Sequence, residues 1–246
     1  MKCADLACFL ILALPVVGSA AARRPLKPEQ TQVIEKLLAD RSCGCPCGQT
    51  LEECFGCSVA KSDLTLAVEG VRAGLDFESI RRRLDSPVTL TLWLDYVQPE
   101  SRAACRIVAE FKERNQSHVK VVYRYLLLAD SPLSRVAATA AECAREIDKF
   151  HIMHKMLYDC ERITERAHVE GAARRGGIDP LLFGASIESD RYATQLDKDA
   201  DAAVTQYEIP RGQSPAVFIN DGLYDGPITV QDLEDTLIQV LFTESL

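Results

Sequence analysis

A strand-like run that leads into a proline-started helix is the feature of this chain that most constrains its fold. Residues 88–94 read Val-Thr-Leu-Thr-Leu-Trp-Leu, an apolar run that predicts a buried strand. Pro99 follows where the first turn of a helix tolerates a missing N–H. The apolar face of this helix consists of Ala104, Ile107, Val108 and Phe111. A second strand is expected at residues 119–126, so the order predicts a right-handed βαβ unit.

A helical stretch and a second group of strands complete the pattern. Residues 134–206 have helical periodicity, with breaks near residues 147, 160, 176 and 186. A third strand is expected at residues 215–220, and Asp221-Gly222 predicts a tight turn into a fourth. A last helix is expected from residue 229 to about residue 241. The order is therefore βαβ, then helices, then ββα.

Several segments in this order resemble DsbA-like thiol-disulfide oxidoreductases. They are Asp95-Tyr96, the turn Gln98-Pro99-Glu100-Ser101, residues 140–157, and Gly212-Gln-Ser-Pro-Ala-Val-Phe-Ile-Asn220. The resemblance covers residues 87–246. It implies an α/β thioredoxin fold with an inserted helical domain at about residues 134–206. A small helical, cysteine-rich segment at residues 23–86 precedes it.

The chain departs from that family at the active-site turn. The family reads Cys-Pro-x-Cys there, whereas this chain has Gln98 and Ser101 at the two cysteine positions. Disulfide exchange requires a thiolate nucleophile and a sulfur to attack, so neither residue supports it. Whether the chain is an enzyme is therefore open. If it is one, the resemblance implies a protein thiol-disulfide oxidoreductase.

The resemblance also assigns a role to Ser214-Pro215. In the family this proline is cis and faces the active-site turn, where it leaves a backbone edge available to an extended substrate. Ser214 and Pro215 are therefore the predicted substrate-binding residues, and an extended polypeptide or protein is the predicted partner. On this interpretation the chain is a binding or chaperone-like module that has kept the peptide groove and lost the redox pair.

The N-terminus predicts export. Lys2 precedes an uncharged apolar stretch and a run of small residues, which together indicate a signal peptide at residues 1–22. The expected location is periplasmic or extracellular, with membrane attachment only through an uncleaved signal segment. The formal net charge of −8 argues against a nucleic-acid partner.

Five cysteines crowd into fifteen residues just after the first predicted helix. They are Cys43, Cys45, Cys47, Cys54 and Cys57. Thiolates in this number fit a zinc site, although no cofactor follows from the spacing alone. The C-x-x-C pair Cys54 and Cys57 also fits redox-active thiols, which makes a relocated thiol-disulfide oxidoreductase the alternative function. Structural disulfides are the third interpretation. Residues 50–80 also weakly resemble the helical domain of CcmH-type cytochrome c maturation proteins.

Overall fold

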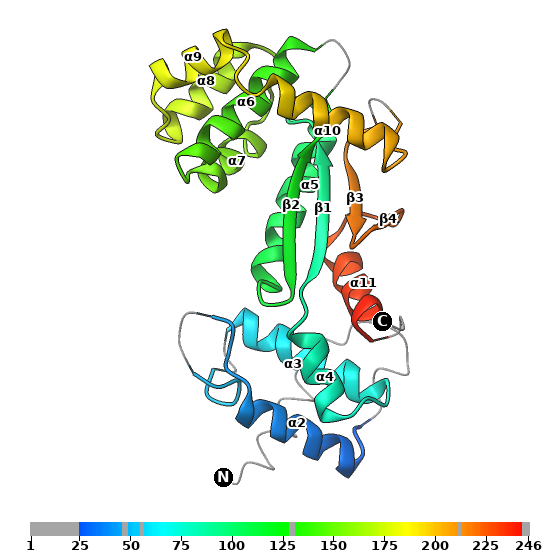
Figure 1. Cartoon of the computed structure of the whole chain (residues 1–246). Helices are drawn as coiled ribbons and strands as arrows, with labels where there is room; N and C mark the ends of the chain where they lie inside the picture. Colours follow the sequence, from blue (N-terminus) through cyan, green and yellow to red (C-terminus); the bar gives the residue numbers. More distant parts are fainter. Residues whose placement is uncertain (1–24, 46–48, 55–56, 128–130, 211–212, 243–246) are drawn as a thin grey trace. The chain divides into compact units, whose positions relative to one another are not determined.

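The structure is a computed structural model that describes residues 25–45, 49–54, 57–127, 131–210 and 213–242 (Figure 1). The predicted signal peptide and Cys47 lie outside these residues. The elements are α2 (Pro28–Asp40), α3 (Ser58–Arg72), α4 (Phe77–Leu84), β1 (Val88–Leu94), α5 (Pro99–Arg114), β2 (Val119–Tyr125), α6 (Pro132–Glu146), α7 (Phe150–Tyr158), α8 (Arg166–Arg175), α9 (Pro180–Glu188), α10 (Ala193–Thr205), β3 (Ala216–Ile219), β4 (Gly222–Tyr224) and α11 (Val230–Phe242). Among the described helices, none has the length and apolar composition that a bilayer span requires.

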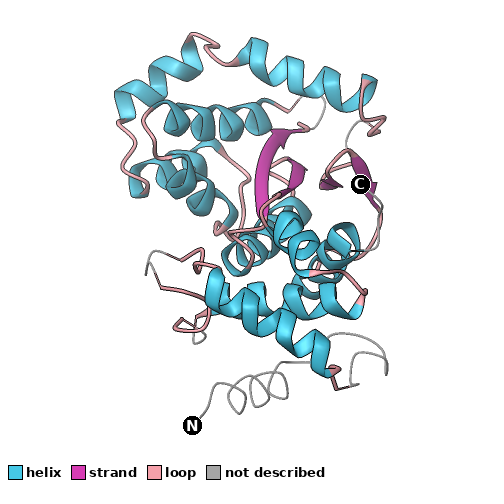
Figure 2. Ribbon diagram, turned by 60° about the horizontal axis from the view of Figure 1, so that its bottom comes forward, coloured by secondary structure: helices cyan, strands magenta, loops and turns pink. Residues whose placement is uncertain are grey.

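The described strands form one sheet in the order β2-β1-β3-β4 (Figure 1). Figure 2 shows the strands in magenta among the more numerous helices in cyan. β3 is antiparallel to β1, with Trp93 opposite Ala216, and it is also antiparallel to β4. This confirms the predicted α/β thioredoxin fold with a helical insertion. The predicted helix breaks are also confirmed, because α6 to α9 end at Glu146, Tyr158, Arg175 and Glu188.

The chain divides into two compact units, and the boundaries run through β1, α5 and β2. The first unit comprises the described parts of residues 1–89, 110–120 and 226–246, and the second comprises residues 90–109 and 121–225. The cysteine-rich segment therefore shares a unit with the last helix of the chain. The sheet and the inserted helices make up the second unit.

Helix α3 is the centre of the first unit. It packs against α2, α4 and α11, and it buries Leu64, Ala67, Val68 and Val71. Gly70 permits the close approach of α4, because a Cβ at this position would lie 2.8 Å from Cγ1 of Ile80. α3 begins earlier than the pattern predicted, at Ser58 instead of Leu64, because Cys57 caps it through its sulfur.

A buried carboxylate in α3 is held by two cationic or hydrogen-bonding partners. Asp63 is fully buried, and its Oδ1 lies 2.5 Å from Nε2 of His118. The other ring nitrogen of His118 lies 3.1 Å from the carbonyl oxygen of Leu84. Arg41 Nε donates to Asp63 Oδ2 at 3.3 Å. These contacts tie α3 to the ends of α2 and α4 and to the loop before β2.

The second unit has its core where β1 and β3 meet the helical insertion. Trp93, Phe218, Leu126, Ala203 and Ile209 form one buried apolar cluster. Within the insertion, α6 packs against α7, α8 and α9.

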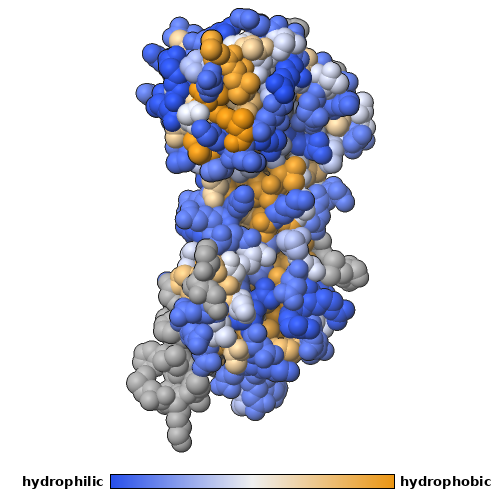
Figure 3. Space-filling model, turned by 60° about the vertical axis from the view of Figure 1, so that its left-hand side comes forward, coloured by the Kyte–Doolittle hydropathy of each residue, from blue (hydrophilic) through white to orange (hydrophobic). Residues whose placement is uncertain are grey.

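An apolar area remains exposed on the helical part of the second unit (Figure 3). The large exposed apolar side chains of these helices and their connections are Leu181 in α9, 84% exposed, and Ile147 after α6, 38% exposed. A third, Leu223, lies in β4 and is 61% exposed. Exposed apolar surface of this kind on a folded domain is typical of contact sites for other molecules.

We expect His118→Leu to destabilise the first unit by about 3 kcal/mol, the cost of leaving a buried charged acceptor without one of its hydrogen-bond partners. The physical reason is that Asp63 keeps its buried charge and loses its closest partner. Asp85→Asn is the matched control, because Asp85 binds the same Arg41 but is 54% exposed, and it should cost less than about 1 kcal/mol. Urea unfolding measures both. Equal losses for the two variants would contradict the assigned role of Asp63.

Candidate functional site

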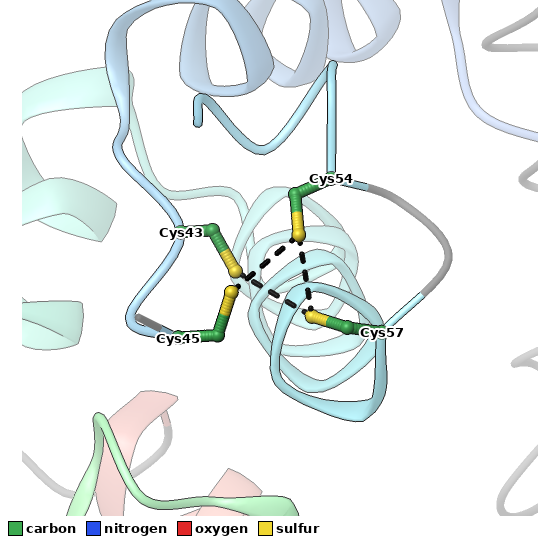
Figure 4. A group of neighbouring side chains, drawn as sticks. All are labelled: Cys43, Cys45, Cys54 and Cys57. Atoms are coloured by element: carbon green, nitrogen blue, oxygen red, sulfur yellow. Dashed lines mark hydrogen bonds between the residues drawn. The ribbon is translucent and has the colours of Figure 1, made fainter. Parts of the chain in front are cut away.

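Four of the five clustered cysteines converge on one point in the first unit (Figure 4). The sulfur atoms of Cys43, Cys45, Cys54 and Cys57 all lie within 4.8 Å of one another. The separations are 3.6 Å for Cys43 and Cys57, 3.5 Å for Cys45 and Cys54, and 3.5 Å for Cys54 and Cys57. A zinc ion with Zn–S bonds of about 2.3 Å places its four sulfurs about 3.8 Å apart, so these sulfurs match a tetrathiolate site.

Short backbone hydrogen bonds position the sulfurs. Ser42 and Thr50 form an isolated antiparallel bridge, and the Cys43 N–H donates to the carbonyl of Gln49 at 2.8 Å. This brings the C-x-C pair beside the start of the segment that carries Cys54. The Cys57 N–H then donates to the carbonyl of Cys54 at 3.2 Å, which closes the C-x-x-C turn.

Gly44 is required between the first two ligating positions. A Cβ at this residue would lie 1.7 Å from Oγ of Ser117, which is closer than any non-bonded contact permits. The C-x-C segment therefore passes directly over the loop before β2. A side chain at position 44 would displace that segment, and Cys43 and Cys45 with it.

The pKa values of Cys43 and Cys57, the first and last cysteines of the group in sequence, are shifted in opposite directions. Burial raises the pKa of the Cys43 thiol to about 12. Burial also acts to raise the pKa of Cys57, but the Ala60 N–H and the neighbouring thiols donate to its sulfur and lower the pKa overall. A divalent metal ion deprotonates the thiols that coordinate it, so a bound metal would hold Cys43 as thiolate despite its burial. In the part of the chain that the structure describes, no other group of three or more metal-ligating side chains comes together.

The turn Gln98-Pro99-Glu100-Ser101 lies in the second unit, after the end of β1. Asp95 is buried and organises it: its Oδ1 accepts the Val97 N–H at 2.9 Å, and its Oδ2 accepts the Ser134 hydroxyl at 2.7 Å. The Gln98 N–H donates to the carbonyl of Asp95 at 3.0 Å. Gln98 is partly exposed, and Pro99 and Glu100 are exposed. The turn therefore presents Pro99 and Glu100 outward at the start of α5, whereas the amide nitrogen of the Gln98 side chain is buried.

Ser101 faces inward and joins the turn to a distant segment. It is fully buried, and its Oγ lies 2.6 Å from Oγ of Ser214. The same oxygen accepts the Asp95 N–H at 3.2 Å. The Ser214–Pro215 peptide bond is cis. The structure thus brings the predicted turn residue Ser101 and the predicted substrate-binding residue Ser214 into direct contact, and both Ser101 oxygen interactions are internal to the fold.

Arg102 is a site residue that the sequence pattern did not reveal. It is 4% exposed and donates to the carbonyls of Tyr96 and Val97, each at 2.8 Å, and to that of Glu161 at 3.2 Å. Burial lowers the pKa of its guanidinium. Arg102 therefore fixes the backbone of the turn to the chain segment after α7. In the α5 pattern Arg102 falls opposite the apolar face of Ala104, Ile107, Val108 and Phe111, where a charged residue is expected to be exposed, so no signal in the pattern pointed to its burial.

Comparison with known proteins adds three findings. A family model described as thioredoxin matches residues 83–239. Among curated proteins, a Na⁺/H⁺ antiporter NhaA of Nitrosospira multiformis is 26% identical over 163 residues. The match covers 63% of this chain and 24% of the antiporter, so the chain spans about a quarter of that relative's length.

Solved structures agree on the fold. A thioredoxin-like oxidoreductase from Silicibacter pomeroyi has a TM-score of 0.57 at 22% identity, covering 65% of this chain and 90% of its own. BdbD from Bacillus subtilis has a TM-score of 0.55 at 20% identity, covering 64% and 89%. The thiol-disulfide exchange protein alpha-DsbA2 from Wolbachia pipientis has a TM-score of 0.53 at 18% identity, covering 63% and 83%. At these identities the likeness shows a DsbA-like thioredoxin fold.

We expect Ser101→Ala to destabilise the second unit by about 1–3 kcal/mol, because it leaves the buried Ser214 hydroxyl without its partner. Ser214→Ala should cost a similar amount. The double variant should cost less than the sum, because no orphaned hydroxyl remains, and urea unfolding of all three completes the cycle. Strict additivity would contradict a direct interaction between the two hydroxyls.

Proposed function

The chain belongs to the thioredoxin family, and from this premise we propose that it is an exported polypeptide-binding protein. It binds extended or unfolded polypeptide at the turn of its thioredoxin-fold unit and performs no disulfide exchange there. The cysteine cluster of the first unit holds a zinc ion. Export is supported by the signal-peptide pattern of residues 1–22.

The observation that carries the binding proposal is the Ser101–Ser214 contact. The two buried hydroxyls are 2.6 Å apart and join the turn to the segment before β3. Disulfide exchange would instead require a sulfur on the turn. A serine that is consumed by internal hydrogen bonds supports a structural role for position 101.

The backbone beside this contact supports binding of an extended chain. Ala216 is the first residue of β3 paired with β1, so residues 213–215 lie ahead of the ladder. Gln213 is exposed and Pro215 is partly exposed. Backbone that is not used in a ladder and lies at the start of a strand suits β-augmentation by an incoming peptide.

The exposed apolar side chains of the second unit suit an unfolded client. Leu223 in β4 and Leu181 in α9 offer contacts for the apolar side chains that a folded protein hides. The proposed binding is therefore driven by backbone hydrogen bonds and apolar contacts without a covalent step.

The geometry of the cysteine cluster weighs against the alternative function, in which Cys54 and Cys57 are the redox-active thiols. The sulfur of Cys54 is 3.5 Å from that of Cys57 and also 3.5 Å from that of Cys45, so the pair is not set apart from the other thiols. The two sulfurs of a disulfide lie about 2.05 Å apart. All three sulfur–sulfur separations in the cluster are instead close to the distance between two sulfurs that bind the same zinc ion.

A trapping experiment tests the binding proposal. Gln98→Cys places one thiol at a partly exposed position of the turn, with no second cysteine at position 101 to resolve a mixed disulfide. Its thiolate attacks a client disulfide, forms one new S–S bond and releases one client thiol. With scrambled ribonuclease as client, we expect a stable adduct that peptide mapping places at residue 98, and at least about ten times less adduct with native ribonuclease.

Ser101→Cys is the matched control for this trap. Position 101 is fully buried, so a thiol there should capture no client. If Gln98→Cys captures no more client than Ser101→Cys, or captures native and scrambled ribonuclease equally, the turn is not a polypeptide-binding site.

Metal analysis tests the zinc proposal. We expect one zinc per chain, and loss of that zinc in Cys45→Ser and in Cys57→Ser, because each removes one of four ligands. Cys105→Ser is the control, because Cys105 is buried in the second unit and is not one of the four converging cysteines, so the zinc content should be unchanged. A metal-free protein in which Cys54 and Cys57 cycle between thiol and disulfide with glutathione would establish the oxidoreductase instead.

A further inference from the structure

A cleft in the first unit has no role in the proposed function. It lies between α3, the end of α5 and α11, and its cavity volume is about 260 Å³. All of its lining residues belong to the first unit. The volume lies just below the range of about 300–1,000 Å³ for drug-sized ligands, so the cleft suits a smaller molecule.

The floor of the cleft is apolar. Leu66 in α3 and Leu237 in α11 are buried, and Ile238 in α11 is partly exposed. An aliphatic group placed on this floor leaves water, which contributes about 25 cal/mol per Å² of apolar surface removed. The floor alone therefore favours a hydrocarbon body.

The rim carries polar groups of which most are already used. Ser62 donates to Asn115 at 2.6 Å, and Asn115 donates to the Phe111 carbonyl at 2.9 Å. Arg114 is paired with Glu110 and lies 3.8 Å from Glu234. Lys61 is the exception: among the described residues its ammonium group has no ion pair or hydrogen bond, and only its backbone is used, by Cys57 and Thr65.

The unpaired charge of the lining favours an anion. Arg114 is neutralised by Glu110 and Glu234, so the ammonium group of Lys61 is the charge of the lining that remains for a ligand. Burial raises the pKa of Glu234, although the nearby Arg114 opposes the shift. A wall that desolvates a carboxylate is poorly hydrated, and electrostatic contacts are stronger in such surroundings.

We infer that this cleft binds a small aliphatic carboxylate, with its hydrocarbon chain on Leu66, Leu237 and Ile238 and its carboxylate at Lys61. The site lies apart from the sulfur cluster and from the turn of the second unit in residues and in chemistry, and its ligand is a metabolite-sized anion. Sodium octanoate has the chemistry of this class and serves as the probe.

Calorimetric titration of the zinc-loaded full chain with octanoate, octylammonium and acetate tests the inference. Octanoate should bind once per chain, octylammonium at least about ten-fold more weakly because it opposes Lys61, and acetate not measurably because it lacks the hydrocarbon chain. Lys61→Gln should weaken octanoate binding at least about ten-fold. Lys112→Gln, an exposed lysine of α5 outside the lining, should leave it unchanged.

A steric pair of variants places the ligand in the cleft. Thr65 lines it, and its hydroxyl donates to the carbonyl four residues earlier at 2.9 Å, so Thr65→Phe fills the cleft and should abolish binding. Thr31→Phe is the matched control, because the Thr31 hydroxyl in α2 makes the same kind of bond at 3.2 Å outside the cleft. If Thr65→Phe fails to fold, methyl NMR of the unmodified protein replaces it, and octanoate should shift the Ile238 and Leu237 methyl signals.

Three results would overturn the inference. The first is no octanoate binding, and the second is binding of octylammonium that is equal or tighter. The third is octanoate binding that Thr65→Phe does not weaken and that does not shift the Ile238 and Leu237 methyl signals.

Discussion

The buried carboxylate of Asp63 is the constraint on which the first unit depends. A charge without water must be met by partners inside the fold, and His118 and Arg41 come from segments 55 and 22 residues away. These contacts with Asp63 hold α3 next to the loop before β2 and the end of α2. The N-terminus of the same helix carries Cys57, and its exposed side lines the cleft. Ligand geometry at the cysteines therefore depends on a polar interaction in the core.

Asp95 has the corresponding role in the second unit. Its backbone N–H reaches Ser101, and its carboxylate holds Val97 and Ser134. Arg102 adds three carbonyl contacts from the other side of the turn. The turn is thus supported by buried hydrogen bonds that do not involve sulfur, which explains how a turn with Gln98 and Ser101 at its ends is ordered.

The strand and helix pattern was predictable because it depends on short-range periodicity. The apolar spacing in α5 and the tight turn near Asp221 are local signals. α5 lies where the pattern placed it, and the turn lies one residue earlier than predicted, at residues 220–221, because Gly222 already pairs with Ile219 in the ladder. The Ser101–Ser214 contact was not predictable in this way, since its partners are 113 residues apart. The resemblance to a known family supplied the proximity of the two segments, but not the hydrogen bond between them.

The cysteine cluster illustrates the same limit at close range. The spacing of five cysteines left zinc, redox and disulfide interpretations open, because it does not say how the sulfurs face one another. Only the three-dimensional arrangement brings the sulfurs of Cys43, Cys45, Cys54 and Cys57 within 4.8 Å of one another. The early start of α3 has the same origin, because a cysteine cap is not among the usual signals for a helix N-terminus.

The first unit is discontinuous in the chain, and this has a consequence for the order in which the protein is assembled. The four cysteines lie within fifteen residues of the sequence. Only short loops therefore have to close to form the cluster, and the entropic cost of closing them is small. Helix α3, by contrast, packs against α11, which begins at Val230. During synthesis the cysteine cluster is complete long before α11 is, and the core around α3 closes only after α11 has left the ribosome.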